Sequence, residues 1–325
     1  MASPSAAPVS GGATGGSRVN SIFSGDVTWT DILDPTQGDM DMLAGKYHFH
    51  PLDLEDCLSA RPLMKVEDHG DHIFISLPFP DQDGQGLIVS RHVSMFLGKD
   101  YLVTMHPSSF KPISAVFQSC KDNAGVRAEL MKSSPYLMYQ IVDRLADGLF
   151  TILDNVQASL DKIEAVVFNE KKSSSVSINA ARRQIALLRR IVYPLGLYVP
   201  DLSKAQKFSK EDLSIYFSDV SHKILKISAI IEEMKEMVEI YNDTDFVTSS
   251  NRTNVVLAIL TIIFTLTIPA SVISSIYGMN VPLPGGAVTG PSGIFGIYTS
   301  MIFIYTAMLV PAFLMALYFK RVGWF

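Results

Sequence analysis

The sequence predicts an α+β domain, then long helices, then two membrane-spanning helices. Three observations predict this: β-branched and aromatic runs over 72–106, apolar residues at helical spacing from residue 134, and an uncharged stretch over 253–319. The 325 residues suffice for two domains of about 150 residues each. We expect four segments: a disordered tail (1–20), a cytosolic α/β domain (21–133), a long-helix stalk region (134–252) and a transmembrane pore region (253–325).

The segments before residue 134 contain short predicted strands and a short predicted helix. The first twenty residues are rich in Ser, Ala, Gly and Pro and lack an apolar run after a basic start, which indicates a disordered tail. HIFISLPF (72–79) is typical of a strand, and HVSMFLGKDYLVTMH (92–106) predicts a hairpin with a Gly-Lys-Asp turn. HPLDLEDCLSA (50–60) predicts a short acidic helix.

Long helices are predicted after residue 134. Apolar residues keep helical spacing over 135–168, and a second helix over 177–195 follows a Lys-Ser-rich turn. A third helix is expected to begin at Ser209 as its cap, with Asp212 three positions later. Nine apolar residues follow at strict 4-3 spacing, typical of a supercoiled seam: Leu213, Phe217, Val220, Ile224, Ile227, Ile231, Met234, Val238 and Tyr241.

This third helix is expected to continue into the membrane. No Pro or Gly lies between Ser209 and Thr253, so we expect one helix of about 65 residues, roughly 100 Å long. A seam of such length needs partners, which come either from the same chain or from other copies of it.

The uncharged stretch is long enough to cross a bilayer twice. Thr253–Phe319 has 67 residues without Asp, Glu, Lys or Arg, and a crossing helix needs roughly 20 apolar residues. Asn254–Ile276 and Ile294–Phe319 are the two candidate spans. A buried hairpin in a large soluble core is the alternative, and the length of the gap argues against it.

Basic residues predict the orientation of these spans. Arg252 precedes the first, Lys320 and Arg321 follow the second, and the loop between them has no positive charge. By the positive-inside bias, both termini are cytoplasmic and the loop faces outward. We expect a multi-pass protein of the cell (inner) membrane, in contact with membrane lipid.

Two membrane helices alone cannot enclose a water-filled path. Either the protein is a membrane-anchored soluble module, or several copies line a pore with the first span. Pro269 interrupts that span and leaves a carbonyl free, which membrane helices tolerate best beside a cavity. A heptad-spaced stripe on the span becomes small and polar toward its outer end: Leu257, Thr261, Phe264, Ile268, Ser271, Ser275 and Gly278.

The end of the first span carries a recognisable motif. Tyr277-Gly278-Met279-Asn280, after a helix containing Pro269 and 45 residues before a basic C-terminus, resembles the signature of the CorA-type divalent cation (magnesium) transporter family, the two-transmembrane Gly-Met-Asn superfamily. HPLDLEDCL…RPLMKVE, NRTNVVLAILTII and YFKRVGWF resemble other parts of that family. The resemblance covers the chain except its first twenty residues.

The resemblance implies a funnel-shaped homopentamer with a central pore that carries Mg²⁺, and also Co²⁺ and Ni²⁺. It implies a selectivity filter formed by Gly278, Met279 and Asn280. Gly278 is expected to adopt a backbone conformation that other residues resist. Five positions carry over as pore-lining residues: Asn254, Leu257, Leu260, Ile268 and Ser271.

The resemblance also implies gating by intracellular divalent ions, with regulatory Mg²⁺ between subunits. The residues that match these regulatory metal positions are Glu55, Asp56, Asp219 and Asp243. Five chains of formal charge −5 each total −25, and divalent ions would relieve the repulsion between acidic surfaces around one axis.

Two alternatives remain open at this stage. The loop after Gly-Met-Asn, VPLPGGAVTGPSG, lacks the acidic residue that many family members have there, so a Zn²⁺ transporter of the ZntB type is one alternative. A membrane-anchored scaffold or sensor without transport is the other.

Pairs of histidines and pairs of arginines give weaker indications of function. His48 with His50, and His69 with His72, lack a third ligand nearby in the sequence, which favours turn or sheet roles. Arginine pairs at 182–183 and 189–190 indicate a solvated or salt-bridged face, and the acidic balance argues against nucleic acid as a partner. No phosphate loop or nucleophile arrangement indicates an enzyme.

Overall fold

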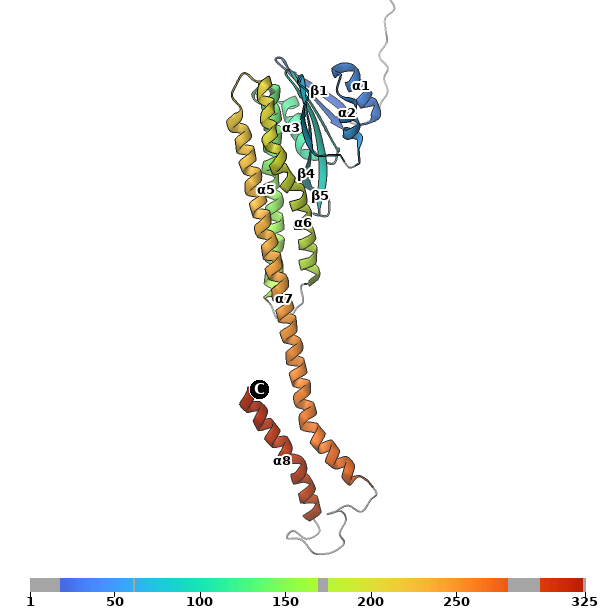
Figure 1. The fold of residues 1–325 in the computed structure, drawn as a ribbon, viewed down its shortest axis with the longest axis vertical. Coiled ribbons are helices and arrows are strands. Elements are labelled where there is room, and N and C mark those ends of the chain that lie inside the picture. Colours follow the sequence, from blue (N-terminus) through green and yellow to red (C-terminus); the bar gives the residue numbers. More distant parts are fainter. Residues whose placement is uncertain (1–17, 61, 169–174, 280–298, 324–325) are drawn as a thin grey trace, which may run out of the picture. The chain divides into compact units, whose positions relative to one another are not determined.

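The computed structural model describes residues 18–60, 62–168, 175–279 and 299–323 (Figure 1). The chain divides into two compact units, Met1–Asn242 and Asp243–Phe325. The first unit contains a six-stranded sheet and the helices packed on both of its faces. The second contains the C-terminal part of one long helix and a further apolar helix.

The sheet of the first unit has the strand order β1-β2-β6-β5-β4-β3. Strands β2 and β6 pair in parallel, and every other neighbouring pair is antiparallel. The hairpin expected over 92–106 is confirmed, because β5 and β6 pair antiparallel on either side of Lys99 and Asp100. The strand bounds are β1 Val19–Ser24, β2 Val27–Leu33, β3 Lys65–Asp68, β4 His72–Gln82, β5 Ile88–Gly98 and β6 Tyr101–His106.

Both faces of this sheet are covered by helices. Successive side chains of a strand point to opposite faces, so each strand contributes to two cores. In β4, Ile73, Ile75 and Leu77 join the larger core, whereas Phe74 joins a smaller one. Helices α1 (Gln37–Tyr47) and α2 (Pro51–Leu58) cover the smaller core. The short acidic helix expected over 50–60 is therefore confirmed as α2, with His50 as its cap and Pro51 at its first position.

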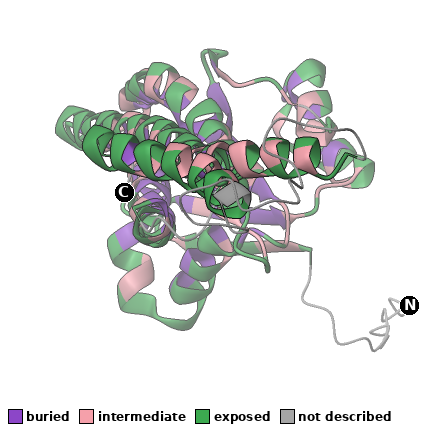
Figure 2. Ribbon diagram, turned by 90° about the horizontal axis from the view of Figure 1, so that it is seen from below, coloured by how far each residue is buried: buried purple, intermediate pink, exposed green. Residues whose placement is uncertain are grey.

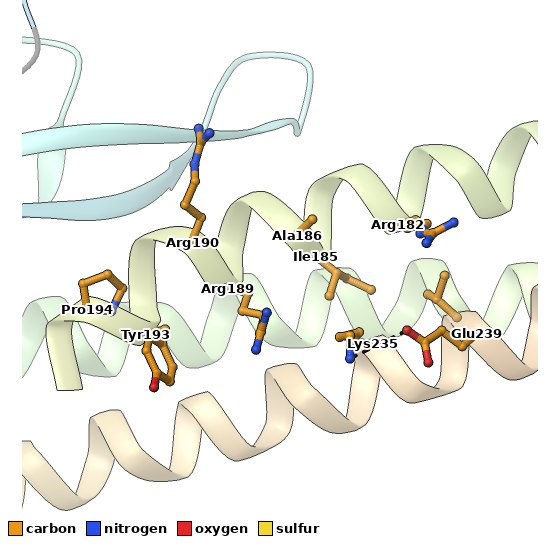
Figure 3. Close-up of a pocket in the computed structure, with 10 residues that line it drawn as sticks. Arg182, Ile185, Ala186, Arg189, Arg190, Tyr193, Pro194, Lys235 and Glu239 are labelled. Carbon is orange, nitrogen blue, oxygen red and sulfur yellow. Dashed lines mark ion pairs between the residues drawn. The ribbon is translucent and has the colours of Figure 1, made fainter. Parts of the chain in front are cut away.

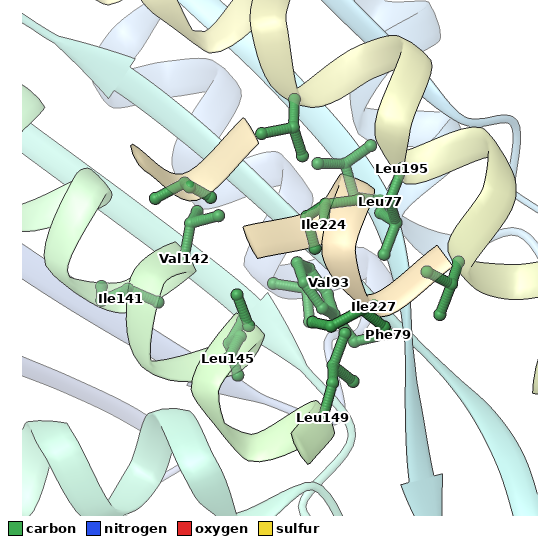
Figure 4. Packing of buried hydrophobic residues seen from close by; sticks show 14 of the residues in the cluster. Leu77, Phe79, Val93, Ile141, Val142, Leu145, Leu149, Leu195, Ile224 and Ile227 are labelled. Carbon is green, nitrogen blue, oxygen red and sulfur yellow. The ribbon is translucent and has the colours of Figure 1, made fainter. Parts of the chain in front are cut away.

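Five α-helices and one 3₁₀ helix contribute to the larger core on the other face. In Figure 4, Leu77 of the sheet lies beside Leu195 of α6, and all of the labelled residues belong to this core. The 3₁₀ helix η1 (Val199–Phe208) was not expected from the sequence, and it follows directly on α6. The helix bounds are α3 Lys111–Asp122, α4 Ala124–Leu130, α5 Ser134–Val167, α6 Ser175–Tyr198 and α7 Ser214–Tyr277.

The 4-3 seam of α7 is satisfied within the chain. All nine seam residues, from Leu213 to Tyr241, are buried and belong to the larger core. Figure 4 shows Ile224 and Ile227 of α7 between residues of α5, α6 and the sheet. The Tyr241 hydroxyl also donates to Glu164 Oε2 of α5 at 2.9 Å. Of the two sources of partners left open by the sequence, the same chain is therefore the correct one.

The predicted length of α7 is confirmed and its predicted start is wrong. The helix has 64 residues and contains Pro269 without ending there. It begins at Ser214, where the Asp212 carboxylate accepts the backbone N–H of Ser214 at 2.9 Å. Ser209 instead ends η1, and its hydroxyl accepts the N–H of Glu211 at 3.1 Å. The Asp212 carboxylate satisfies an N–H that the helix leaves free.

Two helices are long and apolar enough to cross a membrane, namely α7 and α8 (Thr299–Val322). Only 6% of the apolar window of each is buried, and Figure 2 shows these stretches mostly as exposed. A core helix of a soluble protein would be mostly buried, so this exposure agrees with the two predicted spans. The expected start of the second span, at residue 294, lies outside the described residues.

Candidate functional site

The five expected pore-lining residues lie on α7, and all of them are exposed in the single chain: Asn254, Leu257, Leu260, Ile268 and Ser271. The hydroxyl of Thr261 donates to the Leu257 carbonyl at 2.8 Å, and that of Thr265 donates to the Thr261 carbonyl at 2.7 Å. Each hydroxyl keeps acceptor capacity for water, because its proton is used within the helix. This face of α7 can therefore meet water or another copy without breaking its own hydrogen bonds.

The helix closes at the Gly-Met-Asn motif. The N–H of Gly278 donates to the Ser274 carbonyl at 2.9 Å, and that of Met279 donates to the Ile276 carbonyl at 3.3 Å. The expectation that Gly278 takes an unusual conformation is wrong, because its φ is not in the left-handed region. A Cβ at this position would lie 3.1 Å from the Ser274 carbonyl oxygen, a tight contact that a shift of a few tenths of an ångström would relieve. Met279 is 57% exposed, and Asn280 lies outside the described residues.

The two α2 carboxylates differ in their surroundings. Glu55 is exposed, whereas Asp56 Oδ2 forms an ion pair with Lys65 Nζ at 2.9 Å. The same ammonium contacts Asp53 Oδ1 at 2.8 Å and Glu67 Oε2 at 3.1 Å. Burial acts to lower the pKa of Lys65, but its hydrogen bonds to the three carboxylates outweigh burial and raise the pKa above its ordinary value.

The α7 carboxylate is arranged in a similar way. Asp219 is 57% exposed and lies 3.6 Å from Lys223 Nζ. Lys223 reaches across to α5, where it contacts Asp143 Oδ1 at 2.5 Å and Asp147 Oδ1 at 2.9 Å. Burial acts to lower the pKa of Lys223, and the hydrogen bonds to Asp143 and Asp147 raise it overall. Asp243, the fourth expected position, is exposed on α7.

The single chain does not bring these carboxylates together. Among the described residues, no ion pair or hydrogen bond joins Glu55 or Asp56 to Asp219. The expected metal position shared by them would therefore need two copies of the chain. A divalent ion there would also compete with Lys65 and Lys223 for the carboxylates.

The structure brings together one group that the sequence did not indicate. Asp53 of α2 lies beside His69 and His72, and the three offer ligand atoms that all lie within 4.8 Å of one another. The sequence shows only two histidines three residues apart, with Asp53 sixteen positions before His69. The one available signal was a carboxylate between Leu52 and Leu54, at a position that proves to be 1% exposed.

The arginine pairs lie on α6 beside a groove against α7. The groove has a volume of ≈ 640 Å³ and an open, basic rim. Arg189 is paired with Glu232 of α7, as expected for a salt-bridged face. In Figure 3, Arg190 points away from α7 toward the strands, so the two neighbours serve different surfaces. Other lining residues include Arg182, Tyr193, Lys235 and Glu239, of which the last two pair at 3.7 Å.

Comparisons with known proteins agree with this architecture. A sequence model described as "CorA-like Mg2+ transporter protein" matches residues 24–321. The "Cobalt/magnesium transport protein CorA" of Thermotoga maritima is 28% identical over 257 residues, which are 78% of this chain and 73% of that protein.

Solved structures share the fold. "The complete structure of CorA magnesium transporter from Methanocaldococcus jannaschii" matches with a TM-score of 0.70 and 18% identity, over 92% of each chain. The ZntB cytoplasmic domain from Vibrio parahaemolyticus matches with a TM-score of 0.56 and 14% identity, over 70% of this chain and 88% of that one. Because both match, the fold does not choose between the two kinds of transporter.

Proposed function

Because the chain belongs to the CorA-like Mg²⁺ transporter family, we propose that it carries divalent metal cations passively across the cell membrane through a homopentameric pore. Mg²⁺ is the main cargo, and Co²⁺ and Ni²⁺ are further cargo. The membrane potential drives entry, because about 2.3 kcal/mol per elementary charge is available for each 100 mV. A transporter family, and not an enzyme family, is what the chain resembles over most of its length.

One observation carries this proposal. Helix α7 runs without a break from the soluble unit through an apolar, exposed span and closes on Gly278 at the Gly-Met-Asn motif. A stripe of seven exposed residues along that span, from Leu257 to Gly278, supplies a face for a pore.

The proposed filter combines Gly278, Met279 and Asn280 of five copies. Mg²⁺ gives up its water reluctantly, so a ring that accepts the hydrated ion is easier to satisfy than one that strips it. The carbonyl of Gly278 and the side-chain amide of Asn280 can accept hydrogen bonds from coordinated water without holding the ion too tightly. Conduction requires that balance.

The lower pore follows from the same face of α7. Leu257 and Leu260 form an apolar constriction that closes by dewetting, and Asn254 lies at its cytosolic end. Ile268 forms a further narrow position, and Ser271 offers a hydroxyl above it. The exposure of all five side chains in the single chain supports this assignment.

The proposed location is the inner membrane, with both termini in the cytoplasm. Arg252 before the first span and Lys320 and Arg321 after the second support it, since cytoplasmic flanks carry an excess of basic residues.

Regulation is proposed to use Glu55, Asp56, Asp219 and Asp243. A Mg²⁺ ion between an α2 carboxylate of one copy and Asp219 of the next would hold the closed ring. Cytosolic Mg²⁺ then acts as a brake, because a ligand shifts an equilibrium by its differential affinity for the two states. Lys65 and Lys223 weaken this binding by competing for the same oxygens.

A Zn²⁺ transporter of the ZntB type is the second candidate. The observation that favours it is the loop 281–293, which has no acidic residue to concentrate cations. A scaffold or sensor without transport is the third candidate function, and any measured ion flux would exclude it.

Flux through the reconstituted protein tests the proposal. Liposomes containing the full chain would be offered Mg²⁺, Co²⁺, Ni²⁺ and Zn²⁺ in turn, under a fixed membrane potential, with and without a pH gradient. We expect Mg²⁺ influx at the same rate with and without the pH gradient. Zn²⁺ influx that requires the gradient would favour a transporter of the ZntB type. The absence of flux for every ion would favour a scaffold or sensor without transport.

A further inference from the structure

We propose that Asp53, His69 and His72 form a binding site for a divalent transition-metal ion in the soluble unit. This site uses none of the residues of the proposed pore or of the proposed Mg²⁺ positions, although Lys65 contacts both Asp53 and Asp56.

The fold assembles these three side chains from two neighbouring elements. Strands β3 and β4 form an antiparallel hairpin, and the backbone N–H of His69 donates to the His72 carbonyl at 3.0 Å across its turn. Helix α2 packs on the same face and supplies Asp53. The ligand atoms of the three residues all lie within 4.8 Å of one another.

Two buried polar atoms of this group lack a hydrogen-bond partner among the described residues: Asp53 Oδ2 and His72 Nε2. The Asp53 side chain is 1% exposed and the His72 side chain 4%. His69 Nε2 lies 2.8 Å from Asp53 Oδ2, but the two atoms are not aligned as a hydrogen bond. Leaving a buried polar atom unsatisfied is destabilising, and a bound cation would satisfy both atoms at once.

The other atoms of these side chains are already held as metal ligands require. His72 Nδ1 lies 2.7 Å from Asp71 Oδ1, and an N–H donated to this carboxylate leaves the lone pair on Nε2. Asp53 Oδ1 accepts from Lys65 Nζ at 2.8 Å, which orients the carboxylate and leaves Oδ2 for an ion. Such outer contacts accompany metal-binding histidines and carboxylates in general.

The local charge favours a cation. The carboxylates of Asp53, Asp56 and Glu67 share a single ammonium, that of Lys65, which leaves a formal excess of two negative charges. The carboxylate of Asp71 beside His72 adds a further negative charge. Asp71 is 72% exposed, so solvent screens its contribution, whereas Asp53 is deeply buried.

The donor set selects transition metals against Mg²⁺. Imidazole nitrogen suits Zn²⁺, Co²⁺ and Ni²⁺, whereas Mg²⁺ prefers oxygen ligands. Ligands about 2.0–2.1 Å from a tetrahedral ion stand roughly 3.4 Å apart, so ligand atoms that lie within 4.8 Å of one another need only a small adjustment. His69 can supply this adjustment, because its side chain is 28% exposed. Its ring is held by stacking on His50 and His72 and by the Asp53 carboxylate 2.8 Å away. Water completes the coordination on the exposed side of His69.

Cobalt binding to the full chain in detergent tests the site. Co²⁺ would be titrated in excess Mg²⁺, and its visible absorption followed, since ligation by imidazole in a low-coordinate site gives strong bands that hydrated Co²⁺ lacks. We expect one equivalent of Co²⁺ to develop these bands and Zn²⁺ to displace it.

Three variants make the test specific. His69→Gln and Asp53→Asn should each weaken Co²⁺ binding about tenfold or more. His48→Asn is the matched control, because it removes an exposed imidazole from the same region and Asn tolerates the positive φ of 59° there. The control should bind as wild type does. Absence of the bands in wild type, or unchanged affinity in a folded His69→Gln variant, would overturn the proposal.

Discussion

Two of the four candidate regulatory carboxylates, Asp56 and Asp219, are already paired with a lysine of their own chain. Asp56 has Lys65 at 2.9 Å, and Asp219 has Lys223 at 3.6 Å. The longer and more exposed pair is the easier one for a divalent ion to replace, because an exposed ion pair contributes about 0–1 kcal/mol. Asp219 is therefore the residue at which regulation can be tested with least damage to the fold.

We predict that Asp219→Ala raises the internal Mg²⁺ concentration needed to stop influx. The variant lacks a proposed ligand of the closed ring. Mg²⁺ should therefore also protect the first unit of this variant less well against protease. Asp219→Lys is a poorer test, because its ammonium would replace the positive charge of the bound ion and hide the loss of Mg²⁺ binding. Asp201→Ala is the control, because Asp201 is a similarly exposed aspartate on η1 that pairs with Lys204. If both quantities match wild type, Asp219 is only a solvated residue of the stalk.

The half-buried His92 predicts a pH-dependent part of the free energy of unfolding. Burial lowers the pKa of His92 to about 4, against an opposing effect of Asp56. Its pKa in the unfolded chain is higher, so the unfolded state binds more protons as the pH falls below about 6.5. The stability that neutral His92 provides is complete above that pH and is lost on acidification toward pH 4.

Between pH 7 and pH 4.5, the free energy of unfolding of wild type should decrease. We predict that the decrease is about 2–3 kcal/mol smaller in His92→Gln. Chemical denaturation of the full chain in detergent at several pH values measures it. From pH 7 to pH 8 the difference between variant and wild type should stay constant. Parallel curves over the acidic range would show that His92 does not titrate as described.

Single residues can be proposed from the sequence where a local motif carries them. Four consecutive letters indicated Gly278 and Asn280, and short resemblances indicated the acidic candidates; their roles stay predictions. The lysine partners were not predictable: Lys65 lies nine positions after Asp56, and Lys223 meets Asp143 across 80 positions. Asp53 was missed for the same reason, since the β3–β4 hairpin and the packing of α2 bring it to the histidines.

At the scale of elements, α7 shows what a periodic pattern can and cannot indicate. The 4-3 spacing correctly predicted a buried seam over nine residues and one helix of nearly the observed length. The spacing says nothing about which helix covers the seam. The structure covers it with α5, α6 and the sheet, so the seam cannot also join copies of the chain.

We predict that Ile227→Ala lowers the unfolding free energy of the first unit by about 2–4 kcal/mol, because Ile227 is fully buried at the seam. Leu225→Ala on the same helix, where the side chain is 58% exposed, should change it by about 0.5 kcal/mol or less. Denaturant unfolding in detergent compares the two. The copy number of the Ile227 variant should be unchanged. Loss of the oligomer at unchanged stability would mean that the seam does join copies.

At the scale of the whole molecule, the order of elements was predictable and the pairing of strands was not. Alternating and helical patterns correctly indicated the α+β domain, the long helices and the two apolar spans. The parallel pairing of β2 with β6 joins segments about 73 positions apart, such as Thr28 and Tyr101. No local pattern specifies such a pairing, because it depends on which faces the helices bury.

We predict that the detergent-solubilised chain is a closed ring of five copies. The buried seam gives no support for this, so the reason is the incompleteness of the single chain: its proposed pore face is exposed, and two spans cannot enclose water. Native mass measurement of the full chain checks it, with a sample in denaturing detergent as the control for the mass of one copy. A monomer or dimer that still transports ions would contradict the ring.

Mg²⁺ influx through wild type and Asn280→Ala tests the central claim most directly. Both proteins would be reconstituted at equal amounts in liposomes, with Asn242→Ala, an exposed asparagine of α7 outside the pore face, as the matched control. We expect influx driven by the membrane potential in wild type and in the control, and none in Asn280→Ala, which would lack the proposed ring of amides. Influx through Asn280→Ala at the wild-type rate would show that the filter lies elsewhere.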